Sequence, residues 1–155
     1  MSTIYPLMNK QLQSLIEGET NIISVLSNVS ALLNEKLDRI NCVGFYLYNT
    51  ECNELQLGPF QGKVACMHIP MNRGVCGTAA FHKKTLRIPN VHEFEGHIAC
   101  DSTSNSEIVI PIIVEDSIYG VLDIDAPIFA RFSEQDQAGL EDTVRIIEDH
   151  ISKIF

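Results

Sequence analysis

Basic side chains are scarce in this sequence: 11 Lys and Arg residues stand against 20 Asp and Glu residues, for a formal net charge of −9. Nucleic acids and anionic membranes both require clustered Lys and Arg to neutralise phosphate groups. We therefore expect neither as a partner. No stretch approaches the roughly 20 apolar residues of a membrane span, and residues 1–10 lack the basic start and apolar run of a signal peptide. A cytoplasmic protein is the expectation.

Several sequence motifs are also missing. Neither the glycine-rich dinucleotide motif nor the phosphate-binding P-loop occurs, which argues against a nucleotide site. No Cys-x-x-Cys pair is present, and the pairs His97 with Cys100 and Cys66 with His68 do not have zinc-finger spacing. The sequence therefore predicts no metal site and no bound cofactor.

The length of 155 residues, with 45% hydrophobic and 20% charged residues, predicts one soluble domain spanning residues 1–155. Two stretches have apolar residues at helical spacing. The first follows Thr20, the expected N-cap, and the second follows Ser133, which has Asp136 three residues later as in a capping box. The two apolar stripes are Ile22, Leu26, Val29, Leu33 and Leu37, and then Leu140, Val144, Ile147 and Ile151.

Between these helices, short stretches of alternating or continuous apolar residues predict strands, separated by turn residues such as Gly58-Pro59 and Gly62. The predicted strands are residues 43–48, 55–57, 64–69, 86–91, 108–114 and 118–124, and a short helix is expected over residues 78–82, after the glycine-containing stretch 74–77. The last two strands form a hairpin that we expect at the centre of the sheet. This order predicts an α+β domain, an antiparallel sheet with the terminal helices on one face. A pocket is expected on the other face, under the polar 92–105 loop.

Five cysteines are an odd number, which argues against a structural disulfide framework and leaves catalysis, metal binding or burial. Cys100 lies in the 92–105 loop near a histidine and backbone amides, surroundings that lower a thiol pKa, although burial as an inert residue is the common fate of a free cysteine. Cys66 and Cys76 are both candidates to form a disulfide with Cys100. Cys42 is expected in the core, and Cys52 is expected on the surface.

Three carboxylates lie in otherwise apolar strands. Asp123 and Asp125 are two residues apart and therefore face the same side of a sheet, and Glu107 opens the preceding strand. Carboxylates in such positions are costly unless they are partnered, and a cavity that binds an ammonium group supplies the partner. For Asp125 alone, a turn cap before Pro127 is an equal alternative.

A family resemblance runs through these same segments. The residues that carry it are 58–63 (GPFQGK), 74–79 (GVCGTA), 96–101 (GHIACD), 104–109 (SNSEIV) and 120–125 (GVLDID). In unbroken order from about Gly18 to Phe132, they resemble the free methionine-R-sulfoxide reductases, which are GAF-domain enzymes. The resemblance implies a GAF-like fold with a six-stranded antiparallel sheet, and a homodimer.

The resemblance also implies a thiol reaction. Reduction of a sulfoxide requires a thiolate that attacks sulfur, an acid that helps the oxygen leave and a second thiol that resolves the oxidised cysteine. By resemblance, Cys100 is the nucleophile that becomes a sulfenic acid, Cys66 is its resolving partner and Cys76 is a further thiol. Thioredoxin would then reduce the disulfide.

Substrate binding is implied in the same way. Glu107, Asp123 and Asp125 would hold the sulfoxide oxygen and the amino group of free methionine sulfoxide. Backbone amides around Ile98 and Ala99 would hold its carboxylate, because clustered N–H groups favour an anion.

In one place the sequence departs from the family. Where the family has a tryptophan, in a run Asn-Trp-x-Gly-Phe-Tyr, this chain has Cys42 within residues 41–46. The expected ring beside the methyl group of the substrate is therefore missing, and Tyr46 is the residue that would compensate.

The alternative to an enzyme is a ligand-sensing GAF module. Such a module needs an output domain or a partner, and the sequence has no residues left over to encode one. A thiol count before and after the addition of methionine sulfoxide separates the two, since a sensor would leave the count unchanged.

Overall fold

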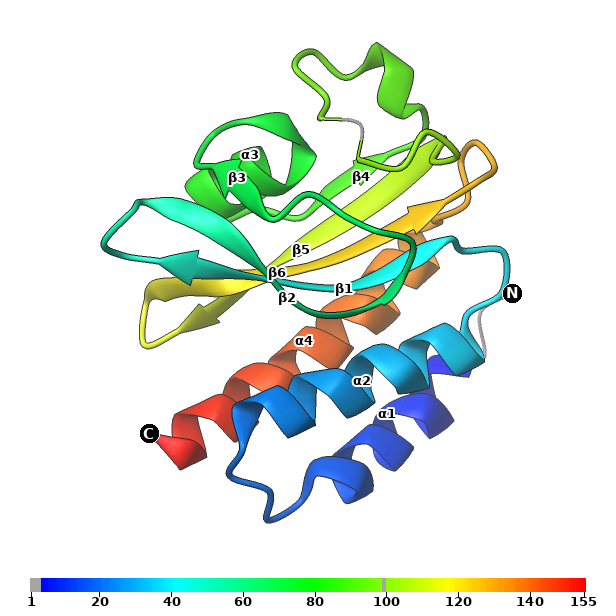
Figure 1. The fold of residues 1–155 in the computed structure, drawn as a ribbon. Helices are drawn as coiled ribbons and strands as arrows, with labels where there is room; N and C mark the ends of the chain where they lie inside the picture. The colour runs from blue at the N-terminus through cyan, green and yellow to red at the C-terminus, as the bar shows by residue number, and fades with distance from the viewer. Residues whose placement is uncertain (1–3, 99) are drawn as a thin grey trace.

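A six-stranded antiparallel sheet with the order β3-β2-β1-β6-β5-β4 forms the middle of the molecule in the computed structural model, which describes residues 4–98 and 100–155 (Figure 1). The strands are β1 (Cys42–Asn49), β2 (Glu54–Gly62), β3 (His68–Pro70), β4 (Leu86–Ile88), β5 (Ser106–Val114) and β6 (Ser117–Ala126). The helices are α1 (Ile4–Ile16), α2 (Ile22–Lys36), α3 (Gly74–His82) and α4 (Glu134–Ile154), with a 3-10 turn, η1 (Val91–Glu93). The predicted α+β class is confirmed.

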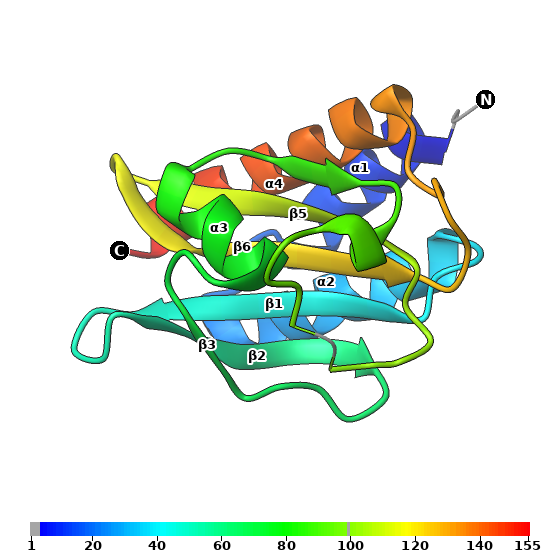
Figure 2. The ribbon, with the colours of Figure 1, turned by 90° about the horizontal axis from the view of Figure 1, so that it is seen from above.

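The sheet separates two apolar cores. Helices α2 and α4 pack on one face, with α1 against both of them on the side away from the sheet, and α3 lies on the other face together with the loop that follows η1 (Figures 1 and 2). Side chains alternate between these layers as strand geometry requires. In β6, Leu122 and Ile124 belong to the core under the three helices, whereas Val121 belongs to the smaller core under α3. Asp123 is therefore on the α3 face.

Both predicted long helices are present, with one correction at a cap. The side chain of Asn21, and not Thr20, caps α2 by accepting hydrogen bonds from the backbone N–H groups of Ile23 and Ser24. The amide oxygen of Asn21 is the group within reach of these free N–H groups. At α4 the capping box of Ser133 and Asp136 is confirmed.

Helix α1 was missing from the sequence prediction, because its short stripe was not identified. Tyr5, Met8, Leu12 and Ile16 recur at steps of three and four, and all four are buried. Pro6 lies in the first turn, where a missing N–H costs nothing.

The predicted turn at Gly58-Pro59 is wrong. Both residues lie inside β2, at a bulge where the pairing with β1 shifts between Gly44 and Tyr46. A bulge is one of the few places where a strand tolerates proline. The predicted strands 64–69 and 86–91 shorten to β3 and β4, and the centre of the sheet is the β1–β6 pair, with β5 next to it.

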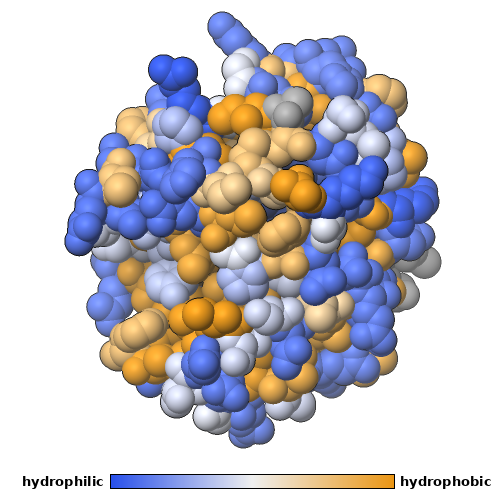
Figure 3. Space-filling view, viewed as in Figure 1, coloured by the Kyte–Doolittle hydropathy of each residue, from blue (hydrophilic) through white to orange (hydrophobic). Residues whose placement is uncertain are grey.

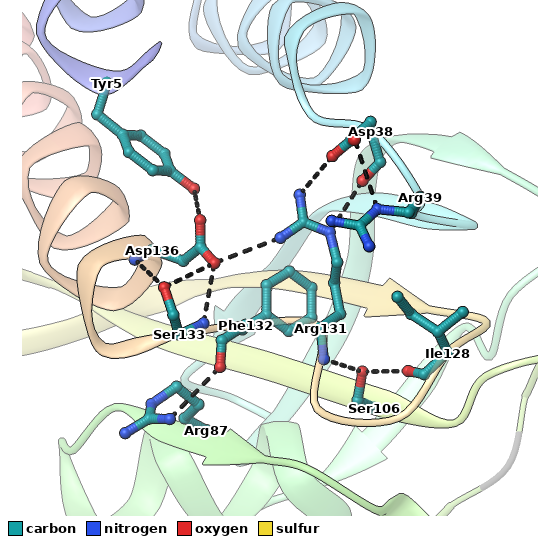
Figure 4. Close-up of polar contacts among 10 residues, drawn as sticks. All are labelled: Tyr5, Asp38, Arg39, Arg87, Ser106, Ile128, Arg131, Phe132, Ser133 and Asp136. Carbon is teal, nitrogen blue, oxygen red and sulfur yellow. Dashed lines mark hydrogen bonds and ion pairs between the residues drawn. The ribbon is translucent and has the colours of Figure 1, made fainter. Parts of the chain in front are cut away.

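Asp136 joins three parts of the chain beneath the sheet (Figure 4). The Tyr5 hydroxyl donates to Asp136 Oδ1 at 2.7 Å, and the backbone N–H of Ser133 donates to Oδ2 at 2.9 Å. Arg131 pairs with Asp136 at 3.3 Å and with Asp38 at 3.1 Å. The carboxylate thus connects α1 with the start of α4 directly, and through Arg131 it is linked to Asp38, which follows α2.

We expect Tyr5→Phe to lower the free energy of unfolding by about 1–2 kcal/mol, because it leaves a buried acceptor on Asp136 without its hydroxyl donor. Tyr48→Phe is the matched control, since its hydroxyl bonds to Asn53 in an exposed turn; it should change stability by less than about 0.5 kcal/mol. Urea unfolding of both variants measures the difference. Equal effects would show that the Tyr5 hydroxyl does not hold α1.

None of the helices in the described part of the chain has the length and apolar character that crossing a membrane requires.

Candidate active site

A small cavity lies between the sheet and α3, on the face where the sequence predicted a pocket. Strands β1, β5 and β6 form its floor, and its walls come from α3, from the β2–β3 connection and from residues 97–104. Its volume is about 40 Å³. The loop of residues 92–105, which we call the lid, crosses above β1 and β6 (Figure 2).

The sheet register brings the three predicted carboxylates together. Glu107 pairs directly with Asp125 across β5 and β6, and Asp123 lies two residues away on the same face. Glu107 and Asp123 are 5% and 7% exposed, and all three residues line the cavity. Burial raises the pKa of all three carboxyl groups, and for Glu107 the neighbouring charges of Asp123 and Asp125 raise it further. The side chain of Asp123 interacts with Glu107 and Cys76, but its buried Oδ1 has no hydrogen-bond partner among the described residues.

Cys66 and Cys100 are joined by a disulfide, with Cα atoms 5.5 Å apart. Cys66 belongs to the β2–β3 connection and Cys100 to the lid, so the bond ties the lid to the edge of the cavity. Tyr46 donates its hydroxyl hydrogen to the carbonyl of Cys66 at 3.0 Å. Tyr46 lines the cavity as expected, and it also holds the loop that carries one disulfide cysteine.

The other three cysteines have free thiols. Cys76 is buried in the first turn of α3, and its thiol donates to Glu107 Oε2 at 3.8 Å. Burial, followed by the charges of Asp123 and Glu107, raises the pKa of this thiol well above its usual value. Cys52 is exposed, as expected. The core assignment of Cys42 is wrong: it is half-buried, faces Asp125 across β1 and β6 and lines the cavity, because its side chain points to the α3 face.

The lid is held by Asp101, which accepts hydrogen bonds from the Asn41 side chain at 2.8 Å and from the Thr103 backbone at 2.9 Å. The hydrogen bonds from Thr103 lower the pKa of Asp101. His97 extends from the lid toward the cavity floor, where its Nε2 lies 3.8 Å from Glu107 Oε1. The sequence placed this histidine near Cys100, but the contact with Glu107 was missed, since only the folded lid creates it.

Two lid residues were predicted to bind a carboxylate through their backbone. Ile98 lines the cavity and lies close to α3, where a Cβ on Gly74 would be 3.0 Å from Ile98 Cγ1. Gly74 also has φ +62°. The positive φ and the close approach of Ile98 both favour glycine at this position. Ala99 lies outside the described residues.

The GAF domain family matches residues 21–151 of the chain. A free methionine-R-sulfoxide reductase of Escherichia coli is 51% identical over 144 residues, which cover 93% of this chain and 86% of that protein. The chain belongs to the free methionine-R-sulfoxide reductase family.

Solved structures of this family have the same fold. The fRMsr of Staphylococcus aureus, in complex with substrate, is 56% identical and superimposes with a TM-score of 0.91 over 97% of each chain. The free methionine-R-sulfoxide reductase of Neisseria meningitidis, also solved in complex with its substrate, is 39% identical, with a TM-score of 0.93 over 96% of this chain and 90% of that one. The GAF-like fold that the sequence predicted is therefore confirmed.

The pocket of this family member also contains three groups of the kinds that bind metal ions. One ligand atom each from Cys76, Glu107 and Asp123 lies within 4.8 Å of the others, and all three residues are buried. The sequence prediction of no metal site considered only ligands close together along the chain. These three residues come from α3, β5 and β6, and only the fold brings them together.

Burial of Glu107 predicts a pH-dependent stability in this family member. Because its folded-state pKa is raised above the value of about 4.3 in an unfolded chain, the folded protein retains a proton that the unfolded chain has lost. The contribution of Glu107 to stability therefore falls as pH rises from about 4.3 through the folded-state pKa.

We expect Glu107→Gln, whose side chain does not titrate, to gain stability relative to the unmodified protein as pH rises above about 4.3, the pKa of glutamate in an unfolded chain. Unfolding in urea at several pH values measures the difference. Glu51→Gln, in an exposed turn, is the control and should show a difference that does not change with pH. A constant difference for Glu107→Gln as well would mean that Glu107 is not held protonated by burial.

Proposed function

We propose that this protein reduces free L-methionine-(R)-S-oxide to L-methionine, with Cys100 as the nucleophile and Cys66 as the resolving thiol. Membership of the reductase family supports the reaction, since relatives from Escherichia coli and Saccharomyces cerevisiae are named free methionine-R-sulfoxide reductases. The observation that carries the proposal is the Cys66–Cys100 disulfide at the edge of a cavity with a carboxylate floor.

The proposed chemistry has two steps. The Cys100 thiolate attacks the sulfoxide sulfur, the oxygen passes to Cys100 Sγ with a proton from the buried acids, and methionine leaves. Glu107 is suited to give that proton, because burial and the neighbouring charges of Asp123 and Asp125 raise its pKa and favour its protonated form. The Cys66 thiol then attacks the sulfenic sulfur, which forms the disulfide and releases water. In total, two thiols are oxidised and one sulfoxide is reduced to a thioether and water.

The cavity chemistry favours a zwitterion. Asp123 Oδ1, which is buried without a hydrogen-bond partner among residues 4–98 and 100–155, and Asp125 are the proposed acceptors for the ammonium group. The lid backbone at Ile98 and Ala99 is proposed to receive the carboxylate. A cavity of about 40 Å³ holds only about three water molecules, which is too few for an amino acid. We propose that reduction of the disulfide releases the lid and enlarges the cavity before substrate binds.

The disulfide is accessible to an external dithiol. Cys66 and Cys100 are both half-buried, and the β2–β3 connection exposes two apolar side chains, Val64 and Met67, at 85% and 66%. Apolar side chains gather along the middle of the face that this connection crosses, between hydrophilic flanks (Figures 1 and 3). We propose that thioredoxin docks here to reduce the disulfide. A homodimer and a cytoplasmic location stay predictions.

Peptide mapping tests the assignment of thiols. The reduced protein is mixed with one equivalent of free methionine-(R)-sulfoxide without reductant, alkylated and digested. We expect a Cys66–Cys100 linkage, with Cys76 recovered in alkylated form. The sample without substrate controls for air oxidation. A Cys76–Cys100 linkage as the sole product would reverse the roles of Cys66 and Cys76.

A further inference from the structure

We propose that Cys76, Glu107 and Asp123 bind a soft divalent cation, with Zn²⁺ the best fit, in the place that the substrate's ammonium group would occupy. The proposal has two parts. Binding of the ion follows from the site itself, and competition with methionine sulfoxide rests on the function proposed above. The ion acts here as an inhibitor and not as a resident cofactor.

The first argument is geometric. The three ligand atoms lie within 4.8 Å of one another, and Cys76 Sγ is 3.8 Å from Glu107 Oε2. Sulfur and oxygen ligands on a tetrahedral zinc, with bonds of about 2.3 Å and 2.0 Å, lie about 3.5 Å apart. Small side-chain rotations therefore close the site around an ion. His97 Nε2 lies 3.8 Å from Glu107 Oε1 but outside the group of ligand atoms that lie within 4.8 Å of one another, so a fourth ligand from the lid requires His97 to move.

The second argument is that one of these groups is incomplete without a ligand. Asp123 is 7% exposed and lines the cavity, yet its Oδ1 has no hydrogen-bond partner in the described structure. A buried carboxylate oxygen without a partner is costly, and a cation bound in the cavity removes this cost. In the disulfide form the cavity of about 40 Å³ is too small for methionine sulfoxide, but it accommodates an ion and a water molecule.

The donor set selects the metal. A thiolate with carboxylates and an imidazole suits zinc, whereas magnesium and calcium require oxygen ligands. On binding, the sulfur–metal bond replaces the S–H bond of Cys76 and an oxygen–metal bond replaces the O–H bond of protonated Glu107, and both protons are released to solvent. Cys66 and Cys100 are occupied by their disulfide, so the disulfide form leaves only Cys42, Cys52 and Cys76 to supply a thiolate.

The test uses the disulfide form of the full chain, freed of metal by chelation. Cobalt(II) replaces zinc as a spectroscopic probe, because a cobalt–thiolate bond gives a charge-transfer absorption. We expect one Co²⁺ per chain with this absorption, displaced by Zn²⁺ and not by Mg²⁺. Cys76→Ser should lose the absorption. Its zinc affinity should fall by at least about tenfold, because even the loss of a residue that only hydrogen-bonds to a metal ligand lowers metal affinity about tenfold or more. Cys52→Ser and Cys42→Ser are the matched controls and should keep both.

Asp123→Asn is a second variant, in case Cys76→Ser fails to fold; it should keep the absorption but weaken zinc binding at least about tenfold. An absorption that survives in Cys76→Ser, or that vanishes in Cys52→Ser or Cys42→Ser, would overturn the site, as would the absence of binding.

In reductase assays of the reduced protein, zinc should raise KM for methionine sulfoxide without lowering kcat. Zinc binding without any reductase activity would refute the proposed function and leave the metal site standing.

Discussion

Replacing Cys100 by serine should reduce turnover of free methionine-(R)-sulfoxide by at least about 10³-fold, because the hydroxyl cannot replace a thiolate as the nucleophile. Steady-state assays with thioredoxin as the reductant measure the loss. Cys52→Ser is the matched control, since Cys52 lies in an exposed turn away from the cavity, and it should retain full activity. Activity of Cys100→Ser near that of the unmodified protein would move the nucleophile to Cys66 or Cys76.

Cys66→Ser sharpens this test. If Cys66 only resolves the sulfenic acid, the variant should still release about one methionine per chain in a first turnover and then stop. Trapping of a sulfenic acid on Cys100 with a dimedone-type reagent identifies the intermediate. Loss of the first turnover as well would mean that Cys66 takes part in the attack on the sulfoxide.

Free methionine-(R)-sulfoxide should be preferred over its N-acetyl derivative by at least about 10³-fold in kcat/KM. Asp123 and Asp125, in the cavity floor beside Glu107, are the proposed acceptors that an ammonium group satisfies. The acetylated amide has no charge and would leave these acids unpaired, and sites built around such polar contacts reject the mismatched ligand by about 10⁴-fold.

The comparison uses both compounds at equal concentration with the same reductant. Asp125→Asn is an informative variant, because it removes the charge of one of the proposed ammonium acceptors. It should lower the ratio of kcat/KM for free methionine-(R)-sulfoxide to kcat/KM for its N-acetyl derivative. Comparable rates for the two compounds with the unmodified protein would contradict a pocket that reads the zwitterion, even if Cys100 proves to be the nucleophile.

Local sequence patterns predicted those parts of the fold that depend on local forces. The apolar stripe of α4 and its capping box, and the β5–β6 hairpin, all follow from neighbouring residues, and the structure confirms them. The bulge in β2 was not predictable in this way. From the sequence, Gly58-Pro59 indicates a turn. In the structure both residues lie in β2, at the bulge where the pairing with the neighbouring strand β1 shifts between Gly44 and Tyr46.

Some features of the candidate site could also be predicted from local sequence, whereas others depend on the fold. The period of a strand placed Asp123 and Asp125 on one face, and the register then brought Glu107 beside Asp125. The connection between Cys66 and Cys100 came from the family resemblance alone, because 34 residues separate them and no local rule relates them. The contact of His97 with Glu107 depends on how the lid folds back over the sheet.

The most direct test of the proposed function is a single turnover without external reductant. Fully reduced protein is mixed with one equivalent of free methionine-(R)-sulfoxide under anaerobic conditions, and methionine and free thiols are counted. The proposal predicts one methionine formed and two thiols lost per chain, both from Cys66 and Cys100. An unchanged thiol count, with the sulfoxide recovered intact, would contradict it and indicate a GAF domain that at most binds its ligand.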